Sequence, residues 1–345
     1  MKLLIENSFV GKVGGISRDG AKFLRIFENL NYELIFTKNS KKRTAVVRKI
    51  FLLKSITRFF KQENRSGYSI YWQQQVSAPS VKLDHKAIHI VRLHDIFPLT
   101  NPEWFTWFGK LNFKIGFNTA KKSAFFVCNS KSTQDTLSRF IPNIYARSIV
   151  IYCDPTKLES GFQVACECQG CNTVIDTPYY ISIGTIEPRK NYSSLVASFL
   201  ESKNKGIDLK LLIVGKYGWK QRHIYQLLRK IDKSKDLIYL EDCCDDALAR
   251  LLKQATAFVS ASLEEGFNIP AVEARNLGVP LLLSDITVHR ELHDSNAIFF
   301  NLKCMEQIWF LNSGDLITPK IYVDSESSQD SIKMKAFIDN IAQNR

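Results

Sequence analysis

The sequence predicts an α/β protein of two domains, each built around a parallel β-sheet. Short apolar runs alternate with amphipathic stretches along nearly the whole chain, which is the pattern of buried strands and covering helices. The pattern occurs twice, on either side of a stretch from 154 to 178 that is rich in Cys, Gly, Thr and Asp. A length of 345 residues also fits two domains of about 150 residues. We therefore expect domains at 1–172 and 173–325, with 326–345 forming a C-terminal helix that packs back on the first domain.

The apolar runs and amphipathic stretches give the expected elements of each half. In the first half we expect strands at 2–5, 32–36, 87–93, 125–128 and 148–152, and helices near 22–30, 46–60, 111–122 and 132–140. In the second half we expect strands at 180–184, 209–215, 237–240, 257–261, 280–283 and 297–300, and helices near 192–201, 221–232, 245–254 and 270–277. Ligands of open parallel sheets bind beyond the carboxyl ends of the strands, so the loops that follow strands are the places to search for chemistry.

The charge of the chain predicts an acidic partner without naming it. A formal charge of +13 and a pI near 9.3 favour phosphate-bearing ligands, anionic lipid headgroups or nucleic acid. Basic and apolar residues are mixed in the segment 41–65, which predicts either a helix on an anionic membrane surface or a core-packed helix with a solvated basic face. No stretch of about 18 apolar residues occurs, and the first residues lack the apolar core of a signal peptide. We expect a cytoplasmic protein, with peripheral attachment to the membrane as an open alternative.

Eight cysteines do not form the regular framework of a secreted, disulfide-linked domain. Cys166, Cys168 and Cys171 could supply three ligands to zinc, but a structural site needs four, and the fourth would have to be distant, as Cys153 is. A surface loop of reduced thiols is the better interpretation. We therefore predict no metal and no other cofactor.

The most informative segment runs from 257 to 292 and reads as a strand, a glycine-containing loop, a helix, a second strand and a turn. Gly266 allows a close approach of the backbone to a ligand, Asn268 suits the cap of the helix, and Pro270 suits the first helical position. The amides and dipole of that helix start predict a seat for a diphosphate. Glu265 in the loop and Glu273 in the helix could then reach the hydroxyls of a sugar and of a ribose; alternatively, both are solvated acids.

This segment resembles the E-x7-E signature of glycosyltransferase family 4, whose members have the GT-B fold of two Rossmann-like domains facing a central cleft and retain the anomeric configuration. The resemblance continues through 179–199, 209–219 and 238–255, and the tail 284–292 is similar to bacterial enzymes that assemble cell-surface polysaccharides such as lipopolysaccharide, often with GDP-mannose. It implies an acceptor-binding first domain and a second domain that binds the nucleotide sugar. It also implies that the reaction needs no metal.

The resemblance assigns further residues of the second half to the donor site. A basic residue after the first strand of the donor domain neutralises the diphosphate in the family, and Lys190 matches it. Many members have an arginine where this chain has Thr185, and Arg189 could compensate as a bidentate ligand of phosphate. The alternative for both cations is a solvated basic turn. The remaining donor-site residues that we expect are Gly184, Gly215, Phe267 and Ile269.

Three features of the first half are candidates for the acceptor side. Gly14 and Gly15 could bring backbone amides to the donor phosphate or the acceptor, although a plain turn or, less well matched, a nicotinamide or flavin loop is possible. His94 and Asp95 end an apolar strand and are followed by Pro102 and Glu103, as in the family, which implies that His94 contacts the transferred sugar and Asp95 the acceptor hydroxyl. The alternative is a structural His-Asp pair. Asn129 and Ser130 end another strand, and Ser132 or Thr133 is expected to cap the next helix.

The sequence thus predicts a retaining hexosyltransferase that uses a nucleotide sugar, with mannose from GDP-mannose as the preferred donor and a glycan or lipid-linked glycan as acceptor. Basic groups and helix amides would stabilise charge on the leaving diphosphate, and Glu265, His94, Asp95, Arg189 and Lys190 would be the catalytic residues. Two alternatives remain open. A catalytically silent subunit could bind the sugar nucleotide, and a basic nucleic-acid-binding protein would explain the charge, although no nucleic-acid-binding motif is present.

Overall fold

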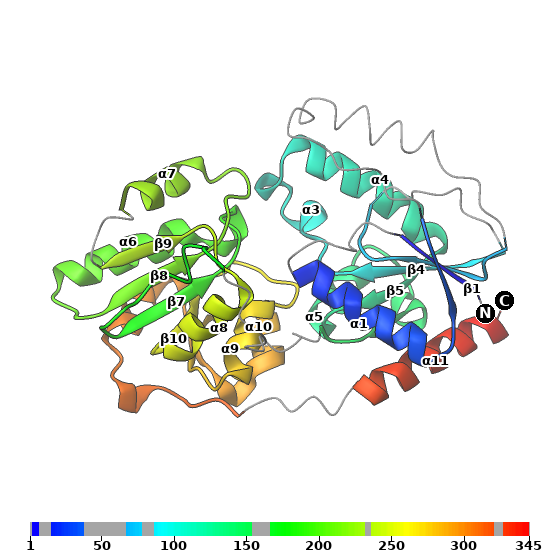
Figure 1. Cartoon of the computed structure of the whole chain (residues 1–345). Helices are drawn as coiled ribbons and strands as arrows, with labels where there is room; N and C mark the ends of the chain where they lie inside the picture. The colour runs from blue at the N-terminus through cyan, green and yellow to red at the C-terminus, as the bar shows by residue number, and fades with distance from the viewer. Residues whose placement is uncertain are drawn as a thin grey trace. The chain divides into compact units, whose positions relative to one another are not determined.

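The chain folds into two compact units in a computed structural model (Figure 1). Unit 1 contains Met1–Asp154 and Asp324–Arg345, and unit 2 contains Pro155–Val323. The structure describes residues 2–6, 15–37, 67–77, 86–153, 166–231, 236–320 and 327–344. The described residues 166–172, which the sequence prediction assigns to the first domain, belong to unit 2.

Unit 1 is built on a six-stranded parallel sheet with the strand order β2-β1-β3-β4-β5-β6. Its strands are β1 (Lys2–Ile5), β2 (Glu33–Phe36), β3 (Ile70–Gln73), β4 (Ile88–Leu93), β5 (Phe125–Cys128) and β6 (Ser148–Val150). Its helices are α1 (Gly15–Asn29), α3 (Phe97–Thr100), α4 (Trp107–Ser123), α5 (Lys131–Ser138) and α11 (Ser327–Gln343), with 3-10 turns at η2 (Pro102–Trp104) and η3 (Ile144–Arg147).

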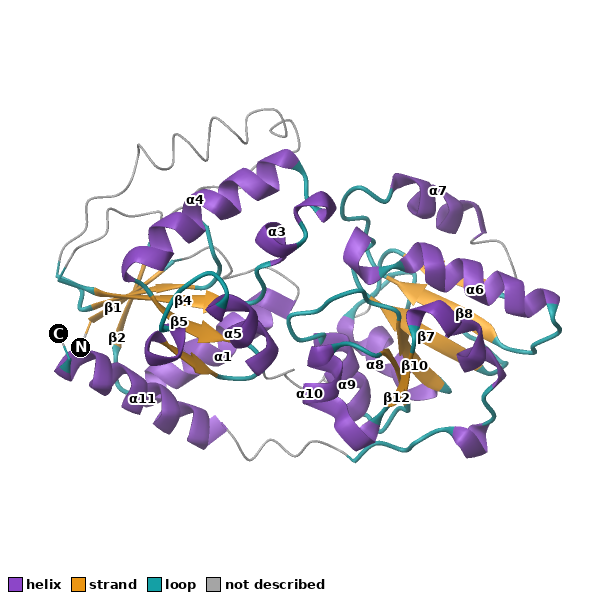
Figure 2. Ribbon diagram, turned by 180° about the vertical axis from the view of Figure 1, so that it is seen from behind, coloured by secondary structure: helices purple, strands orange, loops and turns teal. Residues whose placement is uncertain are grey.

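The sheet of unit 1 is covered on both faces by helices. On one face, α1 and α11 lie side by side, and Phe23 and Ile338 are buried against Trp72 of β3 (Figures 1 and 2). An ion pair of 2.6 Å between Lys22 Nζ and Asp330 Oδ2 joins the two helices. On the other face, α4 and α5 pack against β4 and β5.

Unit 2 has a second six-stranded parallel sheet, with the strand order β12-β11-β10-β7-β8-β9. Its strands are β7 (Tyr179–Ile183), β8 (Lys210–Val214), β9 (Leu237–Leu240), β10 (Ala257–Ser260), β11 (Leu281–Ser284) and β12 (Ile298–Phe300). Its helices are α6 (Tyr192–Asn204), α7 (Arg222–Ile231), α8 (Asp245–Gln254), α9 (Ile269–Asn276) and α10 (Thr287–His293), with 3-10 turns at η4 (Pro188–Lys190), η5 (Asp294–Asn296), η6 (Leu302–Phe310) and η7 (Ser313–Asp315). One core lies under α6, α7 and η6, and another under α8 and α9.

The strand order of unit 2 creates a topological switch point between β7 and β10. From β7 the chain proceeds outward through β8 and β9, and then returns to the other side of β7 and proceeds through β10, β11 and β12. The loops that follow β7 and β10 consequently leave the sheet in opposite directions. In doubly wound sheets this is the place where ligands bind.

The structure confirms the predicted fold class of parallel sheets with flanking helices, and every predicted strand is present with its ends within two residues of the expected ones. Strand β3 is an addition, because its short run Ile70–Gln73 is followed by further glutamines and gives no strand signal. Helix α1 begins at Gly15 rather than near Lys22. The predicted helix at 46–60 lies outside the described residues. Within the described ranges, no helix is both long and apolar enough to span a bilayer.

Candidate functional site

The switch point of unit 2 brings together the predicted basic pair and the first predicted glutamate. Arg189 and Lys190 form the end of η4 after β7, and Glu265 lies in the loop after β10. The two loops are joined directly, because the backbone N–H of Leu263 donates a 2.7 Å hydrogen bond to the carbonyl of Arg189. Residues that are 75 positions apart in sequence therefore share one site, as the sequence predicts for a phosphate-binding edge of the sheet.

Glu265 holds both cations. Its carboxylate is paired with the Arg189 guanidinium, and its Oε1 lies 2.6 Å from Lys190 Nζ. The other end of the Arg189 guanidinium lies 2.7 Å from Glu187 Oε1. Burial raises the pKa of Glu265, but the charges of Arg189 and Lys190 outweigh it and lower that pKa to about 2. Glu265 is thus a permanent anion at neutral pH, and its first partners are the two cations.

A buried polar network supports this cluster from the adjacent strands. Ser262 Oγ donates a 2.8 Å hydrogen bond to Glu265, and it lies 3.1 Å from Ser260 Oγ. Asn268 Nδ2 donates to Ser260 Oγ at 3.1 Å and lies 2.8 Å from Nε2 of His289. The His289 Nδ1 lies 2.8 Å from the carbonyl of Ser284, so Nδ1 carries the proton and Nε2 accepts. The sequence analysis missed His289, whose signal is weak because a histidine early in a helix is common.

Asn268 does not cap α9 with its side chain, contrary to the sequence prediction. It occupies the N-cap position with φ 66° and makes no side-chain capping hydrogen bond, because its amide is committed to Ser260 and His289. An asparagine tolerates this left-handed conformation better than most residues. Its Oδ1 is buried and has no hydrogen-bond partner among the described residues. Through its contacts with Ser260 and His289, the Asn268 side chain therefore fixes the turn that leads into α9.

The start of α9 offers fewer amides than the sequence predicts. The helix begins at Ile269, so Pro270 occupies the second position and contributes no N–H. The amide of Ala271 already donates to the carbonyl of Asn268 at 3.0 Å. Glu273 follows in the first turns of α9 with only 4% of its surface exposed. A ligand at this helix start would therefore depend on side chains at least as much as on backbone amides.

The predicted glycines lie where two strand ends approach each other closely. A Cβ at Gly215 would stand 1.9 Å from the carbonyl oxygen of Gly184, so this position admits no side chain. Thr185 is exposed just after Gly184, in the loop that leads from β7 to Arg189. Gly266 and Phe267 are buried in the loop that leads into α9, which accounts for the remaining donor-site residues that the sequence assigns.

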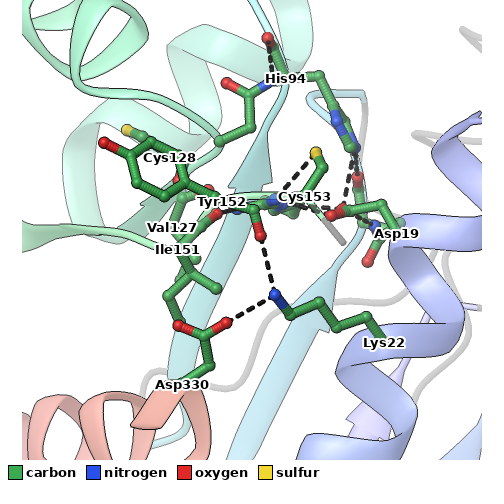
Figure 3. Close-up of polar contacts among 12 residues, drawn as sticks. Asp19, Lys22, His94, Val127, Cys128, Ile151, Tyr152, Cys153 and Asp330 are labelled. Carbon is green, nitrogen blue, oxygen red and sulfur yellow. Dashed lines mark hydrogen bonds and ion pairs between the residues drawn. The ribbon is translucent and has the colours of Figure 1, made fainter. Parts of the chain in front are cut away.

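His94 and Asp95 follow β4 at the carboxyl end of the unit 1 sheet, as predicted. His94 Nε2 lies 3.1 Å from the carbonyl of Gln74 and 3.8 Å from Asp19 Oδ2 (Figure 3). Burial lowers the pKa of His94, although Asp19 opposes this effect, so the imidazole is neutral at pH 7. Asp95 accepts a 3.3 Å hydrogen bond from the backbone N–H of Phe97, which supports the structural alternative for this side chain.

A fully buried ion pair lies beneath His94. Arg92 donates from Nε and Nη2 to the two carboxylate oxygens of Asp19, at 2.8 and 2.7 Å. Arg92 also donates to the carbonyls of Cys128 and Ile151 at 3.0 and 2.7 Å. Burial raises the pKa of Asp19, but Arg92 outweighs it and lowers that pKa below its usual value. The sequence analysis missed this pair, because an aspartate in an amphipathic helix and an arginine in an apolar strand give no signal that they meet.

The other candidates of unit 1 have mixed outcomes. Gly14 lies outside the described residues, and Gly15 is the first residue of α1 rather than part of a loop. Pro102 and Glu103 belong to the exposed turn η2. The cap of α5 is Ser130, whose Oγ accepts a 3.0 Å hydrogen bond from the N–H of Thr133, and not Ser132 or Thr133 as predicted. The neighbouring Asn129 donates from Nδ2 to the carbonyl of His94 at 2.8 Å, which confirms a scaffold role.

Cys153, which the sequence offers only as a distant fourth ligand, does not belong to the cysteine cluster. Cys153 belongs to the core of unit 1, where its Sγ lies 3.4 Å from Arg92 Nη2. Cys166, Cys168 and Cys171 belong to unit 2, and their sulfur atoms lie near that of Cys244. Cys244 is the N-cap residue of α8.

Comparisons with known proteins match the part of the chain that contains this site. Residues 172–301 match the family described as glycosyl transferases group 1. The serotype-specific mannosyltransferase WbdA of Escherichia coli is 28% identical over 225 residues, which are 61% of this chain and 27% of WbdA. The O-antigen chain mannosyltransferase B of Escherichia coli is 34% identical over 110 residues, which are 32% of this chain and 29% of that protein. The matched part thus spans about a quarter of the length of these relatives.

The fold is also that of known structures. The crystal structure of HepE from Anabaena, in complex with UDP and glucose, matches 100% of this chain and 99% of HepE with a TM-score of 0.59 and 16% sequence identity. At that identity the similarity establishes the fold alone. It agrees with the doubly wound sheets and confirms the two-domain GT-B class that the sequence predicts. The family match over 172–301 includes the cluster of Arg189, Lys190 and Glu265.

Proposed function

We propose that the chain is a hexosyltransferase that transfers mannose from GDP-mannose to a hydroxyl of a glycan or lipid-linked glycan, with retention, during the synthesis of a cell-surface polysaccharide. Two relatives that are named mannosyltransferases support the sugar, and one of them is named for the O-antigen chain. A structural neighbour in complex with UDP and glucose supports a nucleotide sugar as donor. The proposal extends these names to this chain, whose match covers about a quarter of each relative.

The observation that carries the proposal is the cluster of Arg189, Lys190 and Glu265 at the switch point of unit 2. Two cations side by side would repel each other, and Glu265 keeps them in one place. Phosphate oxygens are matched by a guanidinium and an ammonium, which have five and three N–H donors respectively, so that contacts with carboxylates and phosphate can coexist. Both cations would stabilise the charge that grows on the leaving diphosphate.

The two glutamates have different roles in this proposal. Glu273 lies in α9, eight residues beyond Glu265, and its carboxylate would accept hydrogen bonds from the ribose hydroxyls. Glu265 primarily positions Arg189 and Lys190, and its remaining lone pairs would accept hydrogen bonds from the hydroxyls of the sugar. His94 and Asp95 stay candidates for the contact with the transferred sugar and the acceptor. In this scheme the donor phosphate takes the acceptor proton, so no general base is assigned.

Nucleotide binding tests the donor site. We expect GDP and GDP-mannose to raise the melting temperature of the chain, since a ligand at 100 times its Kd adds about 2.7 kcal/mol of stability. Lys190→Met and Glu273→Ala should abolish the shift. Lys203→Met is the matched control, because Lys203 forms its ion pair with Asp236, at the amino end of β9 and thus at the opposite edge of the sheet. If UDP or dTDP sugars shift the melting temperature instead, the base is wrong; if no nucleotide does, the donor site is wrong.

A second measurement separates the enzyme from a silent binding subunit. Incubation with GDP-mannose and a lipid-linked glycan should release GDP and yield a product whose new linkage has the α configuration of the donor, as NMR of the anomeric proton would show. Nucleotide binding without transfer to any acceptor would favour the silent subunit. Association with anionic membranes through 41–65 stays a prediction, since those residues lie outside the described ranges. A cytoplasmic location stays a prediction as well.

A further inference from the structure

Four cysteines of unit 2 converge at a place that the proposed transferase reaction does not use. Cys166, Cys168 and Cys171 belong to the segment before β7, and Cys244 precedes α8. Their four sulfur atoms all lie within 4.8 Å of one another. Cys171 Sγ lies 3.5 Å from both Cys168 Sγ and Cys244 Sγ. In a tetrahedral zinc site with Zn–S bonds of ~2.3 Å, neighbouring sulfurs are ~3.8 Å apart. The observed convergence has the size of such a site.

The backbone around the four sulfurs is fixed by contacts that do not involve them. The side chain of Gln169 accepts hydrogen bonds from the backbone N–H groups of Glu241 and Asp242, at 2.8 and 3.2 Å. Arg250 Nη2 donates to the carbonyls of Gly170 and Thr173, at 2.8 and 3.1 Å. These bonds attach the cysteine-containing segment to the loop between β9 and α8 and to α8 itself. Hydrogen bonds of the surrounding backbone and side chains thus fix the positions of the four cysteines.

Close packing at Gly170 supports the same interpretation. A Cβ at this glycine would stand 2.3 Å from Cys243 Sγ and 3.1 Å from the Cβ of Ala247. The turn between Cys168 and Cys171 can therefore approach α8 closely only with glycine at this position. The approach brings Cys171 within reach of Cys244, which is 73 residues away in sequence.

We propose that Cys166, Cys168, Cys171 and Cys244 bind one structural zinc ion. Four protein thiolates complete a tetrahedral shell and leave no open position for substrate, so the ion would stabilise the fold and take no part in the transfer reaction. Zinc displaces the thiol protons, which are released to solvent on binding. The ion would join the segment that leads into β7 to the start of α8. This inference does not depend on the proposed function.

Backbone amides are placed to support thiolate ligands. The N–H of Cys244 donates to Cys168 Sγ at 3.2 Å, and the N–H of Ala247 donates to Cys244 Sγ at 3.5 Å. Hydrogen bonds from outer-shell groups orient metal ligands and tune their charge.

Another group of potential ligands does not qualify as a metal site. Asp19, His94 and Cys153 also lie within 4.8 Å of one another. The guanidinium of Arg92 already contacts both oxygens of Asp19 and the sulfur of Cys153. A metal cation there would have to displace a buried arginine, whereas no cationic side chain contacts the four sulfurs of unit 2 among the residues that the structure describes.

Metal content of the purified full chain tests the proposal. Protein purified without chelator should contain about one zinc per chain by plasma mass spectrometry, and cobalt substituted for zinc should give the sulfur-to-cobalt charge-transfer absorption of a tetrahedral thiolate site. Cys171→Ser and Cys244→Ser should lose the metal. Cys243→Ser is the matched control, since Cys243 is the sequence neighbour of Cys244 and its thiol donates to the backbone carbonyl of Cys244 instead. Loss of zinc from Cys243→Ser to the same extent would contradict the assignment.

Two measurements on wild-type protein test the proposal even if the cysteine variants do not fold. They also distinguish a zinc site from a disulfide. Wild-type protein treated with a mercurial reagent should release its zinc in proportion to the thiols titrated, which needs no variant. Intact mass after alkylation under denaturing, non-reducing conditions should show all eight cysteines alkylated once the metal is removed. A protein that takes up no zinc from added zinc chloride, or a mass that reveals a disulfide among the four, would overturn the proposal.

Discussion

Each unit contains the same elementary pair, a buried carboxylate and an arginine, but in different surroundings. In unit 1, the side chains of Asp19 and Arg92 are both 0% exposed. In unit 2, Glu265 is buried, while the side chain of Arg189 is 20% exposed and Lys190 adds a second cation. The first pair is therefore closed to solvent, whereas the second can be reached from outside.

The difference shows which ion pair is structural. The protein itself satisfies Arg92, through two contacts with Asp19 and further contacts with backbone carbonyls of β5 and the end of β6. Such a pair has no capacity left for a ligand. Arg189 and Lys190 converge on one carboxylate at a solvent-accessible edge, where the proposed diphosphate would join them. An ion pair whose partners are all buried indicates a structural role. An ion pair with one partly exposed partner indicates a candidate ligand-binding site.

Removal of Arg92 should produce the largest effect on stability. Arg92→Leu leaves Asp19 as an uncompensated buried charge, which costs about 3–5 kcal/mol of unfolding free energy. Arg189→Leu leaves Glu265 paired with Lys190 and should cost about 1 kcal/mol, because its guanidinium is partly solvated. Urea denaturation measures the totals, and amide hydrogen exchange in α1 and α9 assigns each loss to its unit.

A double variant sharpens this contrast. Asp19→Leu combined with Arg92→Leu removes both charges and should recover most of the stability that the single change loses. If Arg92→Leu and Arg189→Leu cost the same, the distinction between a structural pair and a ligand-binding pair fails. If Arg189→Leu leaves nucleotide affinity unchanged, the unit 2 pair is structural as well.

The sequence predicts the second site better than the first for a physical reason. Arg189, Lys190, Glu265 and Glu273 lie in loops or helix starts that follow strands, and such positions are visible in the order of the residues. Asp19 and Arg92 meet only because β4 and α1 are packed together, and neither residue type is expected in the interior. The sequence does not identify Cys244 as a neighbour of the other three cysteines for the same reason, since that proximity depends on how α8 packs.

Acidification should weaken unit 2 in two steps. Burial lowers the pKa of His289 from 6.5 to about 4. As the pH falls from 6.5 to 4, this side chain is therefore protonated in the unfolded chain but stays neutral in the folded chain, and the free energy of unfolding decreases. The pKa of Glu265 is lowered from 4.5 to about 2, so the stability from its ion pairs is complete above pH 4.5 and is lost between pH 4.5 and 2.

The variant His289→Gln should lose less unfolding free energy than wild type between pH 6.5 and 4. The contribution of this residue to that loss is at most about 3 kcal/mol. His293, whose pKa burial lowers to about 3, should keep part of the slope. The measurement is the unfolding free energy in urea at pH 7, 5.5 and 4.5, followed by hydrogen exchange in α9. Equal slopes for His289→Gln and wild type would show that His289 is protonated in the folded chain.

The smallest expected effect compares two asparagines with the same backbone conformation in different units. Asn268→Gly relieves a φ of 66°, which gains about 1 kcal/mol, but loses hydrogen bonds to Ser260 and His289 worth about 1 kcal/mol each. We expect a net loss of about 1 kcal/mol. The exposed Asn143 has φ 55° and no side-chain capping bond, so Asn143→Gly should keep the gain of about 1 kcal/mol without an offsetting loss. Thermal unfolding of both variants measures the difference. If Asn268→Gly stabilises the chain, the hydrogen bonds of the Asn268 side chain contribute less free energy than its left-handed backbone conformation costs.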